Sequence, residues 1–91
     1  MDGISKAVVS VLGFDRRGII ARVSMTLFEC GVNILDISQT IVAGYFNMVM
    51  VVDMTGCNFA AADEKLQQLG EELGVQIRMQ RSEIFEAMHQ I

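Results

Sequence analysis

Four stretches of the chain alternate hydrophobic and polar residues with the period of two that is typical of a β-strand. They run from Lys6 to Leu12, from Ile34 to Val42, from Tyr45 to Met54 and from Val75 to Gln80. The third stretch is hydrophobic at every position on one face and only in its middle on the other. The pattern therefore predicts four strands, with the methionine-rich face of the third strand in the core.

Two further stretches place hydrophobic residues at steps of three and four, the spacing of an amphipathic helix. One begins at Ile20 and ends before Gly31, where glycine commonly adopts the left-handed conformation that stops a helix. The other begins at Phe59, after Asn58 as a candidate N-cap, and ends at Gly74. The spacing predicts a helix over each of these stretches.

The predicted order is strand, helix, strand, strand, helix, strand, and the sequence repeats itself at each junction from helix to strand. Gly31-Val32-Asn33-Ile34 in the first half corresponds to Gly74-Val75-Gln76-Ile77 in the second. Two βαβ units with right-handed crossovers place both helices on one face of a four-stranded antiparallel sheet. The predicted fold is an α+β ferredoxin-like βαββαβ plait, with the strands in the spatial order four, one, three, two.

A short C-terminal helix is predicted to follow this plait. Ser82 is its candidate N-cap, and hydrophobic residues then recur at helical spacing at Ile84, Phe85, Met88 and Ile91. The sheet face opposite the two main helices is predicted to carry Val8, Leu12, Ile34, Val49 and Val51. Either the C-terminal helix or a second subunit is then needed to cover that face.

Length and composition narrow the class of protein. The chain has 91 residues, of which 52% are hydrophobic, so we expect residues 1–91 to form one domain with a thin core and surplus hydrophobic surface. That surplus favours a homo-oligomer, a homodimer or larger. No hydrophobic run approaches the roughly 18–20 residues that span a bilayer, and no leader peptide is evident, so we expect a cytoplasmic protein with no membrane partner.

Charge and reactive side chains exclude several functions. The net charge of −4 opposes binding to nucleic acid. An RNA-binding plait would also need stacking aromatic residues on strands one and three, and the first predicted strand has none. Cys30, Cys57 and the single histidine, His89, have no metal-ligand spacing, and no catalytic set of Ser, His and Asp is present. We therefore expect no enzyme activity, no cofactor and no metal.

The connection between the first strand and the first helix is the candidate ligand site. It leads into a helix N-terminus whose first N–H groups lack partners within the helix, and such an end attracts anions. Asp15 serves either as a helix cap or as an acceptor for an ammonium group. Gly18 allows either close approach of a ligand or close packing of the helix on the sheet. The connection consists of Gly13, Phe14, Asp15, Arg16, Arg17, Gly18 and Ile19.

The stretch 13–21, Gly-Phe-Asp-Arg-Arg-Gly-Ile-Ile-Ala, resembles the Gly-x-Asp-Arg-Pro-Gly-hydrophobic-hydrophobic-Ala signature of ACT domains. These are regulatory modules that bind small molecules, usually amino acids. The stretch 31–34 resembles the family's entry into its second strand, while 34–40 and 84–89 resemble a subgroup of stand-alone, uncharacterised prokaryotic ACT proteins. The resemblance covers nearly the whole chain. It has one departure, Arg17, which stands where the signature usually has proline.

The resemblance implies a homo-oligomer with an amino acid held between the loop of one subunit and the second strand of another. Asn33, if it is more than a turn residue, belongs to the second half of that site. The alternative is a ligand-free module for oligomerisation or protein–protein interaction. The candidate ligand-binding residues are Gly13, Phe14, Asp15, Arg16, Arg17, Gly18 and Ile19 on one side, and Asn33 and Ile34 on the other.

Overall fold

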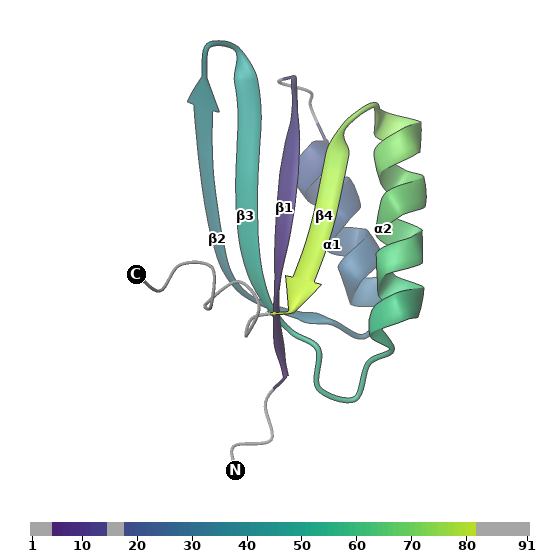
Figure 1. Cartoon of the computed structure of the whole chain (residues 1–91). Coiled ribbons are helices and arrows are strands. Elements are labelled where there is room, and N and C mark those ends of the chain that lie inside the picture. Colours follow the sequence, from purple (N-terminus) through teal and green to yellow (C-terminus); the bar gives the residue numbers. More distant parts are fainter. Residues whose placement is uncertain (1–4, 15–17, 82–91) are drawn as a thin grey trace.

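The strands pair in the order that the pattern predicts, as the computed structural model shows (Figure 1). All three strand pairs are antiparallel, and the spatial order is β2-β3-β1-β4. The predicted ferredoxin-like plait is therefore confirmed. Its elements are β1 (Lys6–Phe14), α1 (Ile19–Glu29), β2 (Asn33–Val42), β3 (Tyr45–Asp53), α2 (Phe59–Leu73) and β4 (Gln76–Arg81).

The structure describes residues 5–14 and 18–81. The predicted C-terminal helix lies outside these residues, as do three residues of the candidate loop, Asp15, Arg16 and Arg17. No helix within the described ranges is long and apolar enough to cross a membrane.

Both helices pack on one face of the sheet, and the hydrophobic core lies between them and the strands (Figure 1). Full burial of a valine, leucine, isoleucine, phenylalanine or methionine side chain in this core contributes about 1.5–3 kcal/mol to the stability of the fold. The alternate residues of β3 from Phe46 to Val52, and Met54 after it, lie in this core, as the sequence predicts. They face the buried residues of β1, because Val52, Met50 and Met48 are the cross-strand partners of Ala7, Val9 and Val11.

The opposite face of the sheet, here called the outer face, carries the other residues of each strand. Val8 pairs with Val51 and Ser10 pairs with Val49, between the core pairs of β1 and β3. Leu12 pairs with Asn47 in the same alternation. The prediction that Val8, Leu12, Val49 and Val51 share this face is therefore confirmed.

Ile34 departs from the prediction. It lies opposite Val52 while Asp36 lies opposite Val51, so Leu35 is an extra residue, a β-bulge. Because Val52 belongs to the core, Ile34 points toward the helices and packs against the core, partly buried. Its expected place on the outer face is wrong. One inserted residue reverses the alternation of side chains, and the hydrophobic pattern gives no sign of it.

Strand β2 is the exposed edge of the sheet. Figure 1 shows it as the outermost strand on the left of the sheet, with β3 on one side and no strand on the other. Ile37 and Ile41 lie opposite the core residues Met50 and Phe46. They nevertheless remain 40% and 61% exposed, so the helices do not bury them. This edge is the part of the described fold that most lacks a partner.

The two junctions from helix to strand have the same geometry, which confirms the internal repeat. Gly31 and Gly74 adopt left-handed φ angles of 78° and 72°. The N–H of the valine after each glycine donates to a carbonyl of the last helical turn, over 2.9 and 3.0 Å. This is the Schellman arrangement. Asn33 and Gln76, the first residues of β2 and β4, therefore occupy equivalent positions in the two halves.

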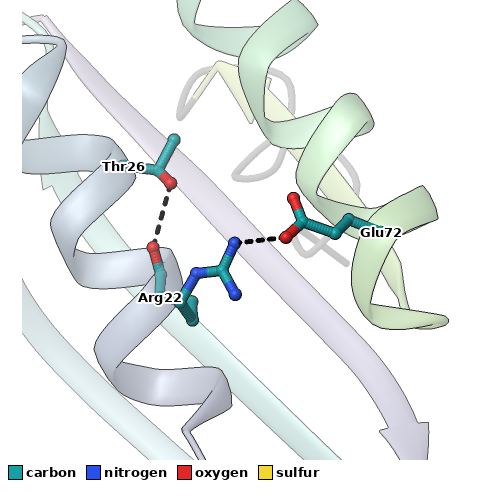
Figure 2. Close-up of polar contacts among 3 residues, drawn as sticks. All are labelled: Arg22, Thr26 and Glu72. Carbon is teal, nitrogen blue, oxygen red and sulfur yellow. Dashed lines mark hydrogen bonds and ion pairs between the residues drawn. The ribbon is translucent and has the colours of Figure 1, made fainter.

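An ion pair connects the exposed sides of the two helices (Figure 2). Arg22 Nη2 lies 2.7 Å from Glu72 Oε2, and the two side chains are about half exposed. The Thr26 hydroxyl donates to the Arg22 carbonyl one turn earlier, over 2.9 Å. An exposed pair of this kind contributes at most about 1 kcal/mol, so the core and not this contact holds the helices in place.

Candidate functional site

The N-terminus of α1 begins at Gly18, which has a left-handed φ of 85° and, as the N-cap, no side chain that could accept from the first N–H groups. The Arg22 N–H donates to the Gly18 carbonyl over 2.9 Å and closes the first turn. A Cβ atom on Gly18 would have no neighbour within 4 Å among the described residues. Close packing of the helix therefore does not explain this glycine, whereas open space before the backbone agrees with approach of a ligand.

Gly13 is a glycine for a different reason. Strand β1 extends to Phe14, two residues beyond the prediction, so Gly13 is a strand residue opposite Phe46. A Cβ atom there would lie 2.5 Å from Val75 Cγ1. The close approach of Val75 is thus sufficient to require glycine at this position, with no ligand involved.

Phe14 stacks on Tyr45 at the end of the sheet, with ring centroids 4.9 Å apart and an interplanar angle of 25°. The expectation of no aromatic residue on strand one is therefore wrong, because β1 reaches Phe14. The two rings are 63% and 46% exposed. With Leu12 and Val42, which are also exposed, they form a hydrophobic patch on the outer face.

Ile19 contributes to the loop end only through its backbone. Its side chain is 2% exposed and belongs to the core. Its N–H group lies in the first turn of α1, where amides have no acceptor within the helix. A ligand at Gly18 would therefore meet N–H groups, which suit an anionic group such as a carboxylate.

The second half of the predicted site centres on Asn33, which is exposed at the start of β2 and lies opposite Asp53 of β3. The Thr55 hydroxyl and N–H donate to Asp53 Oδ1 over 2.6 and 2.9 Å. These hydrogen bonds, with a smaller contribution from the charge of Lys6, hold the pKa of Asp53 below its usual value. Asp53 is thus a carboxylate at neutral pH, beside Asn33.

Sequence reasoning missed Asp53. The available signal was the two-residue turn at 43–44, from which the pairing of β2 with β3 can be counted residue by residue. That count places Asp53 opposite Ile34, because it does not include the bulge at Leu35. With the bulge, Asp53 is the partner of Asn33.

One chain does not bring the two halves of the site together. Asn33 and Asp53 lie in the row of Lys6, the first residue of β1, whereas the loop follows Phe14, its last residue. Eight residue steps of about 3.3 Å separate these rows, or about 26 Å. The two halves lie at opposite ends of the sheet.

Another hollow among the described residues lies elsewhere, between α2 and β4. It measures about 520 Å³, and neither Gly18 nor Asn33 lines it. The Gln67 side chain crosses part of it, since its Nε2 donates to the Ile77 carbonyl over 2.8 Å and to Asp63 over 3.2 Å. This hydrogen bond already uses the Ile77 carbonyl, so that carbonyl is not free to accept from a ligand. The hollow is therefore no better candidate for a ligand site than the predicted one.

Comparison with known proteins decides the family. The profile of the ACT domain matches residues 5–80. The chain belongs to the ACT domain family. The resemblance at 13–21 and 31–34 therefore extends across nearly all of the described fold.

Relatives of similar length support a stand-alone ACT protein. The UPF0237 protein of Bifidobacterium longum is 51% identical over 90 residues, which cover 97% of this chain and 100% of that protein. The structure of an ACT domain protein from Streptococcus pneumoniae matches with a TM-score of 0.80 at 40% identity, over 90% of this chain and 94% of that one. The expected subgroup of stand-alone ACT proteins is therefore confirmed.

A more distant neighbour connects this ACT domain with regulation. The regulatory subunit of aspartate kinase from Thermus thermophilus matches with a TM-score of 0.65 at 28% identity, over 82% of this chain and 49% of that one. ACT domains are regulatory modules that bind small molecules and often oligomerise. The chain is thus a regulatory module.

Proposed function

We propose that this ACT domain binds an amino acid at the interface of a homo-oligomer. One observation carries the proposal: the loop half-site follows Phe14 at one end of the sheet, whereas Asn33 lies in the row of Lys6 at the other end, and these two rows are about 26 Å apart. An amino acid is far too small to bridge that distance. A second subunit is therefore needed to bring one half beside the other.

The exposed edge of β2 offers the means to do so. If two β2 strands pair antiparallel about a two-fold axis, the Asn33 end of one lies beside the Val42 end of the other. Val42 shares a row with Tyr45 and Phe14, at the loop end of the sheet. Pairing would also cover Ile37 and Ile41, which a lone chain leaves exposed.

The chemistry of the two halves is complementary to an α-amino acid. The N–H groups at Gly18 and Ile19 suit a carboxylate. The ionised Asp53 suits an ammonium group, and the Asn33 side chain donates or accepts as required. A ligand held by both subunits would stabilise the paired arrangement over the separated one, which is regulation by population shift.

A thermal-shift screen of the twenty amino acids tests the proposal. At about 100 times Kd, a ligand stabilises the folded protein by about 2.7 kcal/mol. For a domain of this size this raises Tm by about 10–20 °C. Asn33→Ala should abolish the shift, whereas Gln39→Ala, an exposed residue in the middle of β2, should retain it. No shift at tens of millimolar of any amino acid would overturn amino acid binding.

Sedimentation tests the oligomer separately. We expect a dimer or larger assembly at micromolar concentration, weakened by Ile41→Lys on the β2 edge and unchanged by Gln68→Lys on the exposed side of α2. A particle of 10.1 kDa would contradict the shared site.

The alternative function is a ligand-free interaction module, which the hydrophobic patch of Leu12, Phe14, Val42 and Tyr45 favours. An assembly with no response to any amino acid would support this alternative.

A further inference from the structure

We propose that the outer face of the sheet holds a second ligand site, which takes a small carboxylate without an amino group, such as a 2-hydroxy acid. The site is a hollow of about 200 Å³ across β3, β1 and β4. It is distinct from the interface site, since none of its residues belongs to either half. The described residues that line it are Ser10, Leu12, Asn47, Gln76 and Arg78.

The strand register brings these five side chains together. Ser10 lies directly opposite Arg78, and Leu12 lies opposite both Gln76 on one side and Asn47 on the other. Side chains that face each other across strands start about 4.5–5.5 Å apart. A guanidinium, two carboxamides and a hydroxyl thus surround one point, with the Leu12 side chain between them.

The charge of this hollow selects the class of ligand. Within residues 5–14 and 18–81, Arg22 is paired with Glu72 and Arg81 lies 4.6 Å above the Phe59 ring, whereas Arg78 has no carboxylate partner. An unpaired guanidinium binds a carboxylate with two parallel hydrogen bonds. Among the described residues, Arg78 is therefore available to an oxyanion.

No described carboxylate lines the hollow. The acidic residues that the register places on the outer face are Asp36 and Asp53, in the rows of Val51 and Lys6, nearer the start of β1. An ammonium group in the hollow would therefore lose water without gaining a charged partner. The carboxamides of Asn47 and Gln76 suit instead a neutral hydroxyl or carbonyl oxygen.

The internal repeat explains why this second site differs from the first. Gln76 occupies the position that Asn33 holds in the first half of the chain. Two residues later the second half has Arg78, where the first half has Leu35. The repeat thus presents a carboxamide at both junctions, but only the second junction adds a cation.

The size of the hollow limits the ligand to a few carbon atoms. A volume of about 200 Å³ is below the roughly 300–1,000 Å³ of pockets that hold drug-sized ligands. A three- or four-carbon acid fits this limit better than a nucleotide or a peptide.

NMR titration of the ¹⁵N-labelled full chain tests the site with two matched pairs of probes, lactate against alanine and malate against aspartate. Each pair shares a carbon skeleton and differs by a hydroxyl in place of an ammonium group. We expect one of the hydroxy acids to shift the resonances of Ser10, Asn47 and Gln76, including the side-chain amides, and its amino analogue to bind there at least about tenfold more weakly.

Substitutions test whether the Arg78 guanidinium binds the hydroxy acid. Arg78→Gln should weaken binding of the hydroxy acid by about tenfold or more, because it removes the charge-assisted hydrogen bonds. Arg22→Gln, the same change on α1, should leave it unaffected. Absence of any shift at tens of millimolar, equal binding of both members of each pair, or full binding by Arg78→Gln would each overturn the proposal.

The experiments can contradict either proposed site without contradicting the other. Asn33→Ala should abolish the response to an amino acid and preserve the hydroxy acid response at Gln76. A hydroxy acid that instead shifts Gly18 and Asn33 would place its binding at the interface site and contradict the second site.

Discussion

Gly13 and Gly18 flank the same connection but lack side chains for different physical reasons. At Gly13 the neighbour Val75 leaves no room for a Cβ atom, and at Gly18 the left-handed backbone disfavours one although the space is open. The sequence shows two similar glycines, and only the packing separates Gly13, which Val75 crowds, from Gly18, which has open space among the described residues.

Gly13→Ala should therefore destabilise the fold, by about 1–3 kcal/mol, because a Cβ 2.5 Å from Val75 Cγ1 forces the strand or Val75 to move. Urea denaturation measures the loss. Val75→Ala removes the clashing methyl, so the double variant should lose less stability than the sum of the two single variants. Strict additivity would show that Val75 is not the cause. Ser10→Ala on the same strand serves as the control.

Asp53 gives a prediction about pH. Its lowered pKa means that its ionised form stabilises the fold above the carboxyl pKa of the unfolded chain, about 3.9. This contribution is lost as the pH falls from there through the lower folded value. Thr55→Val removes the strongest cause, the hydroxyl that donates over 2.6 Å, so the pKa should rise toward its usual value.

Carboxyl ¹³C shifts followed between pH 2 and pH 6 measure this pKa directly. Thr55→Ser retains the hydroxyl and should keep the pKa low. An unchanged Asp53 titration in Thr55→Val would mean that this hydrogen bond does not determine the pKa.

At the scale of elements, hydrophobic periodicity predicted the helix whose bounds follow from buried residues, and it missed the β-bulge, which inserts one extra residue into a strand. The bounds of α2 agree with the pattern, because its buried stripe, its Asn58 cap and its Gly74 stop all indicate the same segment. The Asn58 side chain accepts from the Ala61 N–H, as a cap should. The bulge at Leu35 was not predictable, since β2 is exposed and its hydrophobic residues fit either register.

The β2–β3 turn offers a stabilising substitution. Ala43 has a φ of 53° and is followed by Gly44 with a φ of 84°, the two positive angles of a type I′ hairpin. Asparagine tolerates the left-handed region far better than alanine does, so Ala43→Asn should stabilise the fold by roughly 0.5–1 kcal/mol. Thermal denaturation measures this change, with Ala43→Val as the variant expected to lose stability. A lower Tm for Ala43→Asn would contradict the hairpin argument.

At the scale of the whole molecule, the candidate site is incomplete within one chain. The sequence supplied Gly18 and Asn33 as its two halves through resemblance to the family, but their separation depends on the strand register, which periodicity leaves undetermined. Asp53, the cross-strand partner of Asn33, could not be identified from the sequence for the same reason.

A site shared between subunits predicts that ligand binding depends on protein concentration. Calorimetric titration should show the apparent affinity for the amino acid falling as the protein is diluted below the dissociation constant of the dimer. The affinity of the outer-face site for a hydroxy acid should stay constant over the same range. An amino acid affinity independent of dilution would mean that the site forms within one chain.

The two edges of the sheet are not equivalent. On β4 the Gln67 side chain already occupies the Ile77 carbonyl, and α2 lies alongside, whereas every residue of β2 except the partly buried Ile34 is exposed. A sheet with two open edges adds strands without limit, and filaments result. Among the described residues β2 is thus the more open edge, and the proposed pairing would use it. If two chains pair through β2 as proposed, growth of the sheet would then stop at two chains, and a filament would not form.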